Sequence, residues 1–62
     1  MLYVARDADG ELNLYKGKPK KGLSWWTPVV GYRIMELDRD KFPEVWWEDE
    51  EPTQVELKIK KQ

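Results

Sequence analysis

The chain has no cysteine and no histidine, and Ser24 is its only serine. Without thiols or imidazoles it can form neither disulfide bridges nor the common zinc sites, and it lacks the usual nucleophile and base groups of enzymes. A chain of 62 residues is also short for a concave pocket that excludes water. We therefore predict a protein that is not an enzyme and that binds no metal and no cofactor.

Long apolar runs are missing as well. No stretch approaches the roughly 20 apolar residues that a transmembrane helix needs, and Met1 to Arg6 lacks the charged start and apolar middle of a signal peptide. The absence of cysteine suits a reducing compartment. The sequence thus predicts a cytoplasmic protein with no membrane partner.

The chain is rich in aromatic side chains for its size. Eight of its residues are aromatic and four of these are Trp, so a few large rings carry much of the apolar surface that folding can bury. We expect one small domain over residues 1–62, with a stability of only about a few kcal/mol because so small a core barely offsets the chain entropy lost on folding.

The clearest pattern lies near the end of the chain, in the stretch around which we expect the rest to assemble. Val55, Leu57 and Ile59 alternate with polar residues, which predicts a strand over about 53–60. A second strand is predicted at 45–48. Adjacent side chains of a strand point to opposite faces, so Trp47 is expected in the core and Trp46 is expected to be partly exposed.

The beginning of the chain predicts a hairpin over residues 2–16. Asp7-Ala8-Asp9-Gly10 separates two short alternating runs, and an Asp-Gly pair between such runs is a strong turn signal. A calcium loop would need more ligands than this string offers. One face is expected to carry Leu2, Val4, Leu12 and Leu14, and the other Tyr3, Ala5 and Tyr15. Because this second face is largely apolar, something is expected to cover it.

Between hairpin and final strand the signals are mixed. Residues 16–22 are rich in Lys, Gly and Pro and predict a flexible loop. Strands are predicted at about 23–27 and 29–37. A helix over 29–37 remains an alternative, but its β-branched and aromatic residues favour a strand. With period two, Val30, Tyr32 and Ile34 would share one face, and the other face would carry Val29, Arg33, Met35 and Leu37.

Asp38 is a suitable cap for one helical turn over residues 39–42, which Pro43 would end and Phe42 would pin to the core. Further on, the four acidic residues Glu48 to Glu51 before Pro52 predict an exposed turn. The predicted fold class is therefore all-β, a small antiparallel sheet or open barrel of four to five strands with one short helical turn.

Charge is unevenly distributed along the chain. Residues 1–35 carry six basic and three acidic side chains, residues 36–51 carry eight acidic and two basic ones, and residues 52–62 are basic again. Such blocks can orient a partner, but folding can also bring them together as ordinary ion pairs. We favour the second interpretation, because exposed ion pairs are common and contribute little.

Several stretches together resemble short uncharacterised proteins of gut Bacteroides and of bacteriophages and prophages. The similar stretches are Tyr3 to Leu12, Gly17 to Pro19, Leu37 to Asp40, Phe42 to Val45, Trp47 to Pro52 and Val55 to Leu57. The resemblance implies a bacterial or phage-derived module. It implies no activity and no binding residues, since none is assigned in that group.

For function, the sequence favours a small module that binds another protein, and we expect a weak two-fold dimer as one form of this binding. Exposed aromatic rings are typical anchors of protein interfaces, and the candidates are Trp46 together with Trp25 or Trp26. The alternative is a module for single-stranded nucleic acid, in which Lys18, Lys20 and Lys21 would contact phosphates beside those rings. The slightly acidic net charge makes nucleic acid the less favoured partner.

Overall fold

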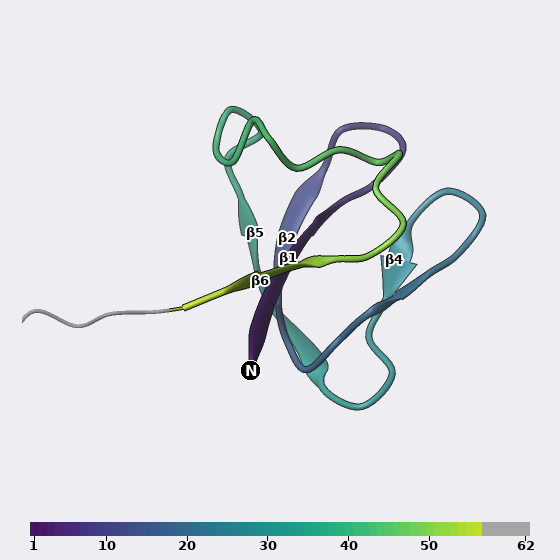
Figure 1. Ribbon diagram of the computed structural model, residues 1–62, viewed down its shortest axis with the longest axis vertical. Helices are drawn as coiled ribbons and strands as arrows, with labels where there is room; N and C mark the ends of the chain where they lie inside the picture. Colours follow the sequence, from purple (N-terminus) through teal and green to yellow (C-terminus); the bar gives the residue numbers. More distant parts are fainter. Residues whose placement is uncertain (57–62) are drawn as a thin grey trace, which may run out of the picture.

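The computed structural model describes residues 1–56, which form two antiparallel sheets. The strands are β1 (Leu2–Arg6), β2 (Leu12–Lys16), β3 (Lys20–Lys21), β4 (Trp26–Thr27), β5 (Tyr32–Leu37) and β6 (Thr53–Val55). Four of them make one sheet in the order β5-β2-β1-β6, and β3 pairs with β4 (Figure 1). The predicted all-β class is confirmed. The main sheet is open, and no part of the described chain is helical.

The predicted hairpin is confirmed as β1 and β2, which form the centre of the main sheet. Asp7 donates its N–H to the carbonyl of Glu11 at 2.8 Å, so three residues turn the chain. The last of them, Gly10, has a φ of +95°, a conformation that costs Gly little and other residues much. The side chain of Asp9 accepts the N–H of Glu11 and completes the turn.

The pairing of β1 with β2 divides the apolar side chains between two faces, as the alternation predicted. We call them the Val4 face, with Leu2, Val4, Leu12 and Leu14, and the Tyr15 face, with Tyr3, Ala5, Asn13 and Tyr15. On the Val4 face, Val45, Leu37, Phe42 and Val55 pack over Val4 and Leu12. On the Tyr15 face, the covering groups are Trp26 and Trp47. The expected cover of the second face is therefore present.

Strand β5 is shorter than predicted and carries a β-bulge. Its pairing partner β2 places Leu14 opposite Met35 but Tyr15 opposite Arg33, so Ile34 is an extra residue. A bulge of this kind interrupts the alternation of side chains. As a result Tyr32 shares the Val4 face with Met35 and Leu37, and the predicted separation of Tyr32 from these two residues was wrong.

In residues 16–31 the bounds of the strands and loops differ most from the predicted ones. The predicted loop 16–22 contains β3 and a buried Pro19, while of the predicted strand 23–27 only Trp26 and Thr27 pair. Leu23 is 99% exposed in the turn between β3 and β4. Just before β5, position 31 must be Gly, because a Cβ there would lie 1.7 Å from the carbonyl oxygen of Lys16. The two backbones cross there too closely for any side chain.

Turns replace two further predicted elements. At Asp38 to Lys41 a single hydrogen bond of 3.0 Å, from the Lys41 N–H to the Asp38 carbonyl, closes a turn instead of the predicted helical turn. The predicted strand 45–48 is also wrong. There the Asp49 N–H donates to the Trp46 carbonyl, and the Trp46 N–H donates to the Asp49 carboxylate. Local hydrogen bonds of the Asp side chain have replaced pairing with a neighbouring strand.

The chain from β5 to β6 makes a long return across the molecule. In Figure 1 it leaves the end of β5, runs past the β1–β2 turn, descends beside β4 and comes back as β6. Strand β6 pairs with β1 and brings Val55 opposite Leu2, on the Val4 face. The strand predicted over 53–60 is thus confirmed at Thr53–Val55. Its remaining apolar positions, Leu57 and Ile59, lie outside the described residues.

Candidate functional site

The predicted anchor Trp26 is a core residue. Its side chain is 5% exposed, its indole Nε1–H donates to the carbonyl of Arg6 at 3.0 Å, and its backbone N–H donates to Oδ1 of Asp7 at 2.9 Å. Its ring also meets that of Trp47 edge to face, with the centroids 6.5 Å apart. Trp26 therefore has little surface for a partner. The exposed member of the pair is Trp25, at 61%.

Trp46 and Trp47 are divided as predicted, although for a different reason. Trp46 is 60% exposed, whereas Trp47 is half-buried against the cluster of Ala5, Tyr15 and Trp26. The turn at Trp46, not the alternation of a strand, directs the two rings apart. Trp46 remains a candidate contact residue, and it is not among the lining residues of the hollows described below.

The three candidate lysines have different environments. Lys21 is part of the fold: its Nζ donates to the carbonyl oxygens of Trp47 at 2.6 Å and Asp49 at 3.0 Å, and lies 4.3 Å from the centre of the Trp47 ring. Lys18 forms an ion pair with Glu51, whose carboxylate accepts a hydrogen bond and raises the pKa of the ammonium group. Lys20 is exposed.

The Lys-rich segment thus lies against the acidic turn, which is the ordinary pairing of charge blocks that the sequence predicts. A hollow of about 490 Å³ lies there, and its lining combines the charged residues Lys18, Lys20, Lys21, Glu50 and Glu51 with Pro19, Trp26, Val29 and Val30. The presence of both charge signs in one lining reduces the attraction of this hollow for an anion.

A second hollow lies beside Trp25, and its lining combines acidic, basic, amide and aromatic side chains. It has a volume of about 340 Å³ and we call it the Trp25 groove. Its lining residues are Asp7, Glu11, Asn13, Tyr15, Trp25, Trp26, Pro28 and Arg33. A further hollow shares Asp7, Glu11 and Trp25 with it and adds Asp9 to the acidic residues. Trp25 and Trp26 are the two residues of this groove that were candidates from the sequence.

Among the hydrogen-bonding groups of the groove, one buried acceptor has no partner in the described residues. Asn13 is 2% exposed, and its Nδ2 donates to Oε2 of Glu11 at 3.1 Å. Its Oδ1 has no hydrogen-bond partner within residues 1–56. The hydroxyl of Tyr15 donates to the carbonyl of Trp26 at 3.4 Å. Buried polar atoms normally have a partner, so this enclosed oxygen is an exception within the fold.

The electrostatics of the groove are acidic. Burial raises the pKa of Asp7, and the hydrogen bond from the Trp26 N–H opposes this only in part. Burial and the nearby Asp7 carboxylate raise the pKa of the Tyr15 hydroxyl. Arg33 is the one basic residue in the lining, and its Nη1 lies 3.7 Å from Glu11. A cation would offset the cost of keeping the Asp7 carboxylate charged.

A third feature is the apolar outer edge of the sheet, at β5 and the segment before it. Exposed apolar side chains follow one another there: Val29 (62%), Val30 (80%), Tyr32 (61%), Ile34 (41%) and Met35 (51%). We call this the β5 surface. Strand β5 is an edge strand, so the backbone groups on its outer side pair with no other described strand.

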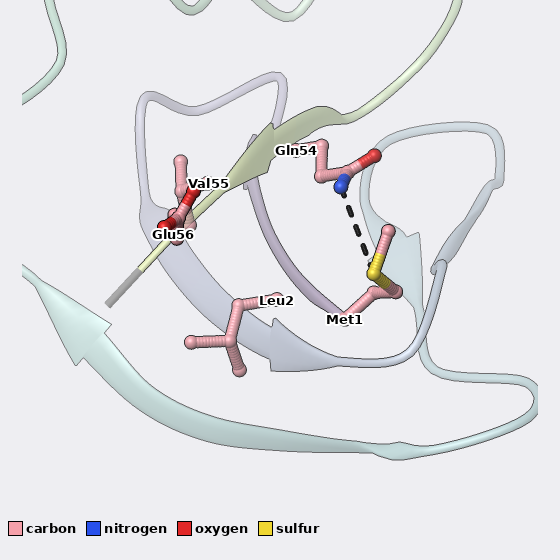
Figure 2. A pocket seen from close by; sticks show the side chains of 5 residues that line it. All are labelled: Met1, Leu2, Gln54, Val55 and Glu56. Carbon is pink, nitrogen blue, oxygen red and sulfur yellow. Dashed lines mark hydrogen bonds between the residues drawn. The ribbon is translucent and has the colours of Figure 1, made fainter. Parts of the chain in front are cut away.

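Two hollows near β6 have Glu56 as the single charged residue in their linings. Figure 2 shows the larger, where the Gln54 amide donates to the Met1 sulfur at 3.7 Å and Leu2 lies below. The smaller, about 180 Å³ on the Val4 face, is almost wholly apolar. Both are lined up to Glu56, where the described chain ends. Neither contains the set of charged and aromatic groups seen at Trp25.

No protein-family model matches the chain, and neither a curated protein nor a solved structure is significantly similar to it. The resemblance to short Bacteroides and phage proteins therefore stays a prediction. Over residues 1–56 there is neither a helix that could cross a bilayer nor a group of acidic residues arranged to hold a metal ion.

Proposed function

We propose that this protein is a non-enzymatic protein-binding module, and that the β5 surface binds a second copy of the chain. The observation that carries the proposal is the run of exposed apolar side chains along an open edge strand. An extended segment can add to such an edge through backbone hydrogen bonds, while its side chains cover the apolar ones. Monomeric soluble proteins seldom leave a large continuous apolar patch uncovered.

The charges on β5 support a second copy of the chain as the partner that binds the β5 surface. Arg33 and Glu36 lie on the same face of the strand, opposite Tyr15 and Asn13 of β2. Two copies of β5 in antiparallel orientation bring the Arg33 end of one strand to the Glu36 end of the other. Such a two-fold contact is self-complementary. The bulge at Ile34 shortens the regular edge, so the expected association is weak.

Sedimentation equilibrium from micromolar to millimolar concentration tests this proposal. The wild-type chain is expected to shift from monomer toward dimer, and Met35→Lys to abolish the shift because it places like charges near the two-fold axis. Leu23→Lys is the matched control, since Leu23 is also an exposed apolar residue but lies in the β3–β4 turn. A monomer throughout, or equal effects of both variants, would contradict the proposal.

Nucleic acid is the alternative partner, and the positions of the lysines give it less support. Lys21 donates to two backbone carbonyls and Lys18 is paired with Glu51, which leaves Lys20 alone of the three without such a contact among the described residues. We expect no salt-sensitive complex with a labelled single-stranded oligonucleotide. Micromolar binding that Lys18→Glu and Lys20→Glu together weaken would favour nucleic acid over protein.

A further inference from the structure

We propose that the apolar hollow on the Val4 face is the docking site for the C-terminal segment of the same chain, residues 57–62, and that Leu57 fills it. The inference does not depend on the pairing of two chains through β5. Three features of the described residues support it: the half-buried apolar lining of the hollow, the fixed wall at Phe42 and the position of Glu56 in the lining.

The lining of the hollow is core surface that the described residues cover only in part. Six apolar side chains meet there: Leu2, Val4, Leu14, Leu37, Phe42 and Val55. Val4 is fully buried, but the other five are half-buried. An apolar group placed in the hollow would therefore remove further apolar surface from water, and this stabilises a fold in proportion to the area buried.

The wall formed by Phe42 is fixed by the fold itself. Phe42 has a φ of +48°, a left-handed conformation that is costly for a bulky residue and persists only where surrounding contacts impose it. Here its carbonyl accepts hydrogen bonds from the Val45 N–H at 2.9 Å and from the Arg6 guanidinium group at 3.2 Å. The Phe42 side chain is thereby held against the core cluster and forms a preformed wall of the hollow.

Size and polarity favour one apolar side chain over a free ligand. The hollow measures about 180 Å³, below the roughly 300 Å³ at which small-molecule pockets begin. Within residues 1–56, Glu56 is the only polar residue of the lining. A free ligand would find few groups to orient it, whereas a side chain of the same polypeptide is positioned by its own backbone and loses less freedom on binding.

The place where the described chain ends identifies the occupant. Val55 and Glu56 are its last two residues, and Figure 2 shows their side chains at the end of β6. Both line the hollow, although successive side chains of a strand point to opposite faces, so the backbone passes along the rim there. Leu57 follows directly, about 3.3 Å of extended chain further on. It is the first apolar residue after Glu56.

A methyl-to-ring NOE in the full-length chain tests the docking directly. Phe42 is the only phenylalanine, so its ring protons can be labelled selectively. An NOE between the Leu57 methyl groups and the Phe42 ring is expected, both in the wild type and in Met35→Lys, which is expected to stay monomeric. In a mixture of labelled and unlabelled chains, the NOE should arise within one chain and not between two.

Matched variants measure what the docking contributes. Leu57→Asn should lower the melting temperature by about 5–10 °C, because it takes a buried Leu side chain from a domain of this size. Ile59→Asn is the control, a similar change two residues further on. It should shift the melting temperature by about 2 °C or less, as expected for a side chain outside the hollow.

Three results would overturn the proposal. Absence of the NOE between Leu57 and Phe42 would mean that Leu57 does not enter the hollow. An NOE that arises only between chains would assign the hollow to the C-terminal segment of a second copy. Equal melting temperatures for Leu57→Asn and Ile59→Asn would mean that neither position has a specific place in the core.

Discussion

The two faces of the main sheet are covered in different ways, although both covers come from segments without long regular structure. On the Val4 face the covering side chains have no polar atoms, and Val45 is their buried centre, with Leu37, Phe42 and Val55 around it. On the Tyr15 face the cover is made of Trp rings, with Trp26 at its centre and Trp47 against it. Side chains without polar atoms close the first face with no hydrogen-bonding requirement, whereas Trp and Tyr bring N–H and O–H groups that need partners.

Each cover is held by one basic residue that donates to backbone carbonyls. Beside the Val4 face, Arg6 makes five such hydrogen bonds, with acceptor oxygens on Gly10, Arg39, Lys41, Phe42 and Val45. Beside the Tyr15 face, Lys21 makes two, to Trp47 and Asp49. The carbonyls of turns have no strand partners, so a cation with several donors replaces the missing backbone pairing.

The comparison also explains why the polar groove lies on the Tyr15 face. The backbone N–H and indole N–H of Trp26 take their acceptors from Asp7 and Arg6, which brings a carboxylate to the rim of an aromatic cluster. The Val4 face has no such requirement, and the hollow there is apolar. The charged groove therefore lies on the aromatic side.

The largest expected effect is at the centre of the aromatic cover. Trp26→Ala should lower the free energy of unfolding by about 3–5 kcal/mol, because it removes a buried ring and leaves its partners without hydrogen bonds. A domain this small should then be largely unfolded, as thermal circular dichroism would show. Trp25→Ala, next in the chain but exposed, should change stability by about 0.5 kcal/mol or less. Similar losses for both would contradict the assignment of Trp26 to the core.

Removing Arg6 tests the cover of the Val4 face. Arg6→Met should cost about 3 kcal/mol, because it keeps an apolar stem but leaves several partly buried carbonyls without donors. Arg6→Lys should recover only part of this loss, since an ammonium group cannot reach five acceptors. Arg33→Met is the control, because the Arg33 side chain is 55% exposed and its ion pair is with Glu11 rather than with backbone carbonyls. Chemical denaturation would measure all three, and full rescue by Lys would show that charge alone matters.

The two adjacent Trp residues in the return segment give the next test. Trp47→Ala should cost about 2 kcal/mol, less than a fully buried Trp, because its ring is only half-buried against Trp26. Trp46→Ala should leave the protein folded with nearly unchanged stability. Equal losses in denaturant titrations would mean that the turn at Trp46 does not separate the two rings.

Lys21 and Lys20 form a matched pair within β3. Lys21→Met should cost about 1–2 kcal/mol, because it removes two charge-assisted hydrogen bonds and a cation–π contact while retaining the apolar stem. The same change at Lys20, which is exposed, should have almost no effect. If both variants melt at the same temperature, Lys21 is not what holds the cover of the Tyr15 face.

The smallest expected effect is the pH dependence from Asp7. The pKa of the Asp7 carboxyl group is raised in the folded protein above the ordinary value of 3.8. The carboxyl group therefore binds its proton more tightly in the folded state than in the unfolded state. Stability from this group is therefore full below the unfolded pKa and falls as pH rises through the folded pKa. Asp7→Asn keeps the acceptor for the Trp26 N–H without the charge. It should remove this slope and modestly raise stability at neutral pH, as melting curves across pH would show; an unchanged slope would contradict this.

Local sequence patterns were sufficient to predict those features that depend on one short stretch of the chain. The Asp-Gly turn with alternating runs on both sides predicted the hairpin and the residues of both faces, since turn geometry and the period of a strand are local properties. The separation of Trp46 from Trp47 was also predicted, and so was the all-β class. Among the candidate contact residues, Trp25 and Trp46 are indeed exposed.

The sequence by itself determined the central hairpin, its two-faced alternation and the charge blocks. Only the tertiary structure decided what covers each face, because the deciding contacts join distant residues. The guanidinium group of Arg6 reaches carbonyls up to 39 positions away, and Asp7 accepts from Trp26 across 19. The bulge at Ile34, the choice of Trp26 over Trp25 for the core and the free oxygen of Asn13 follow from such contacts. Their energies depend on which donors and acceptors meet after folding, and residue order alone does not specify that.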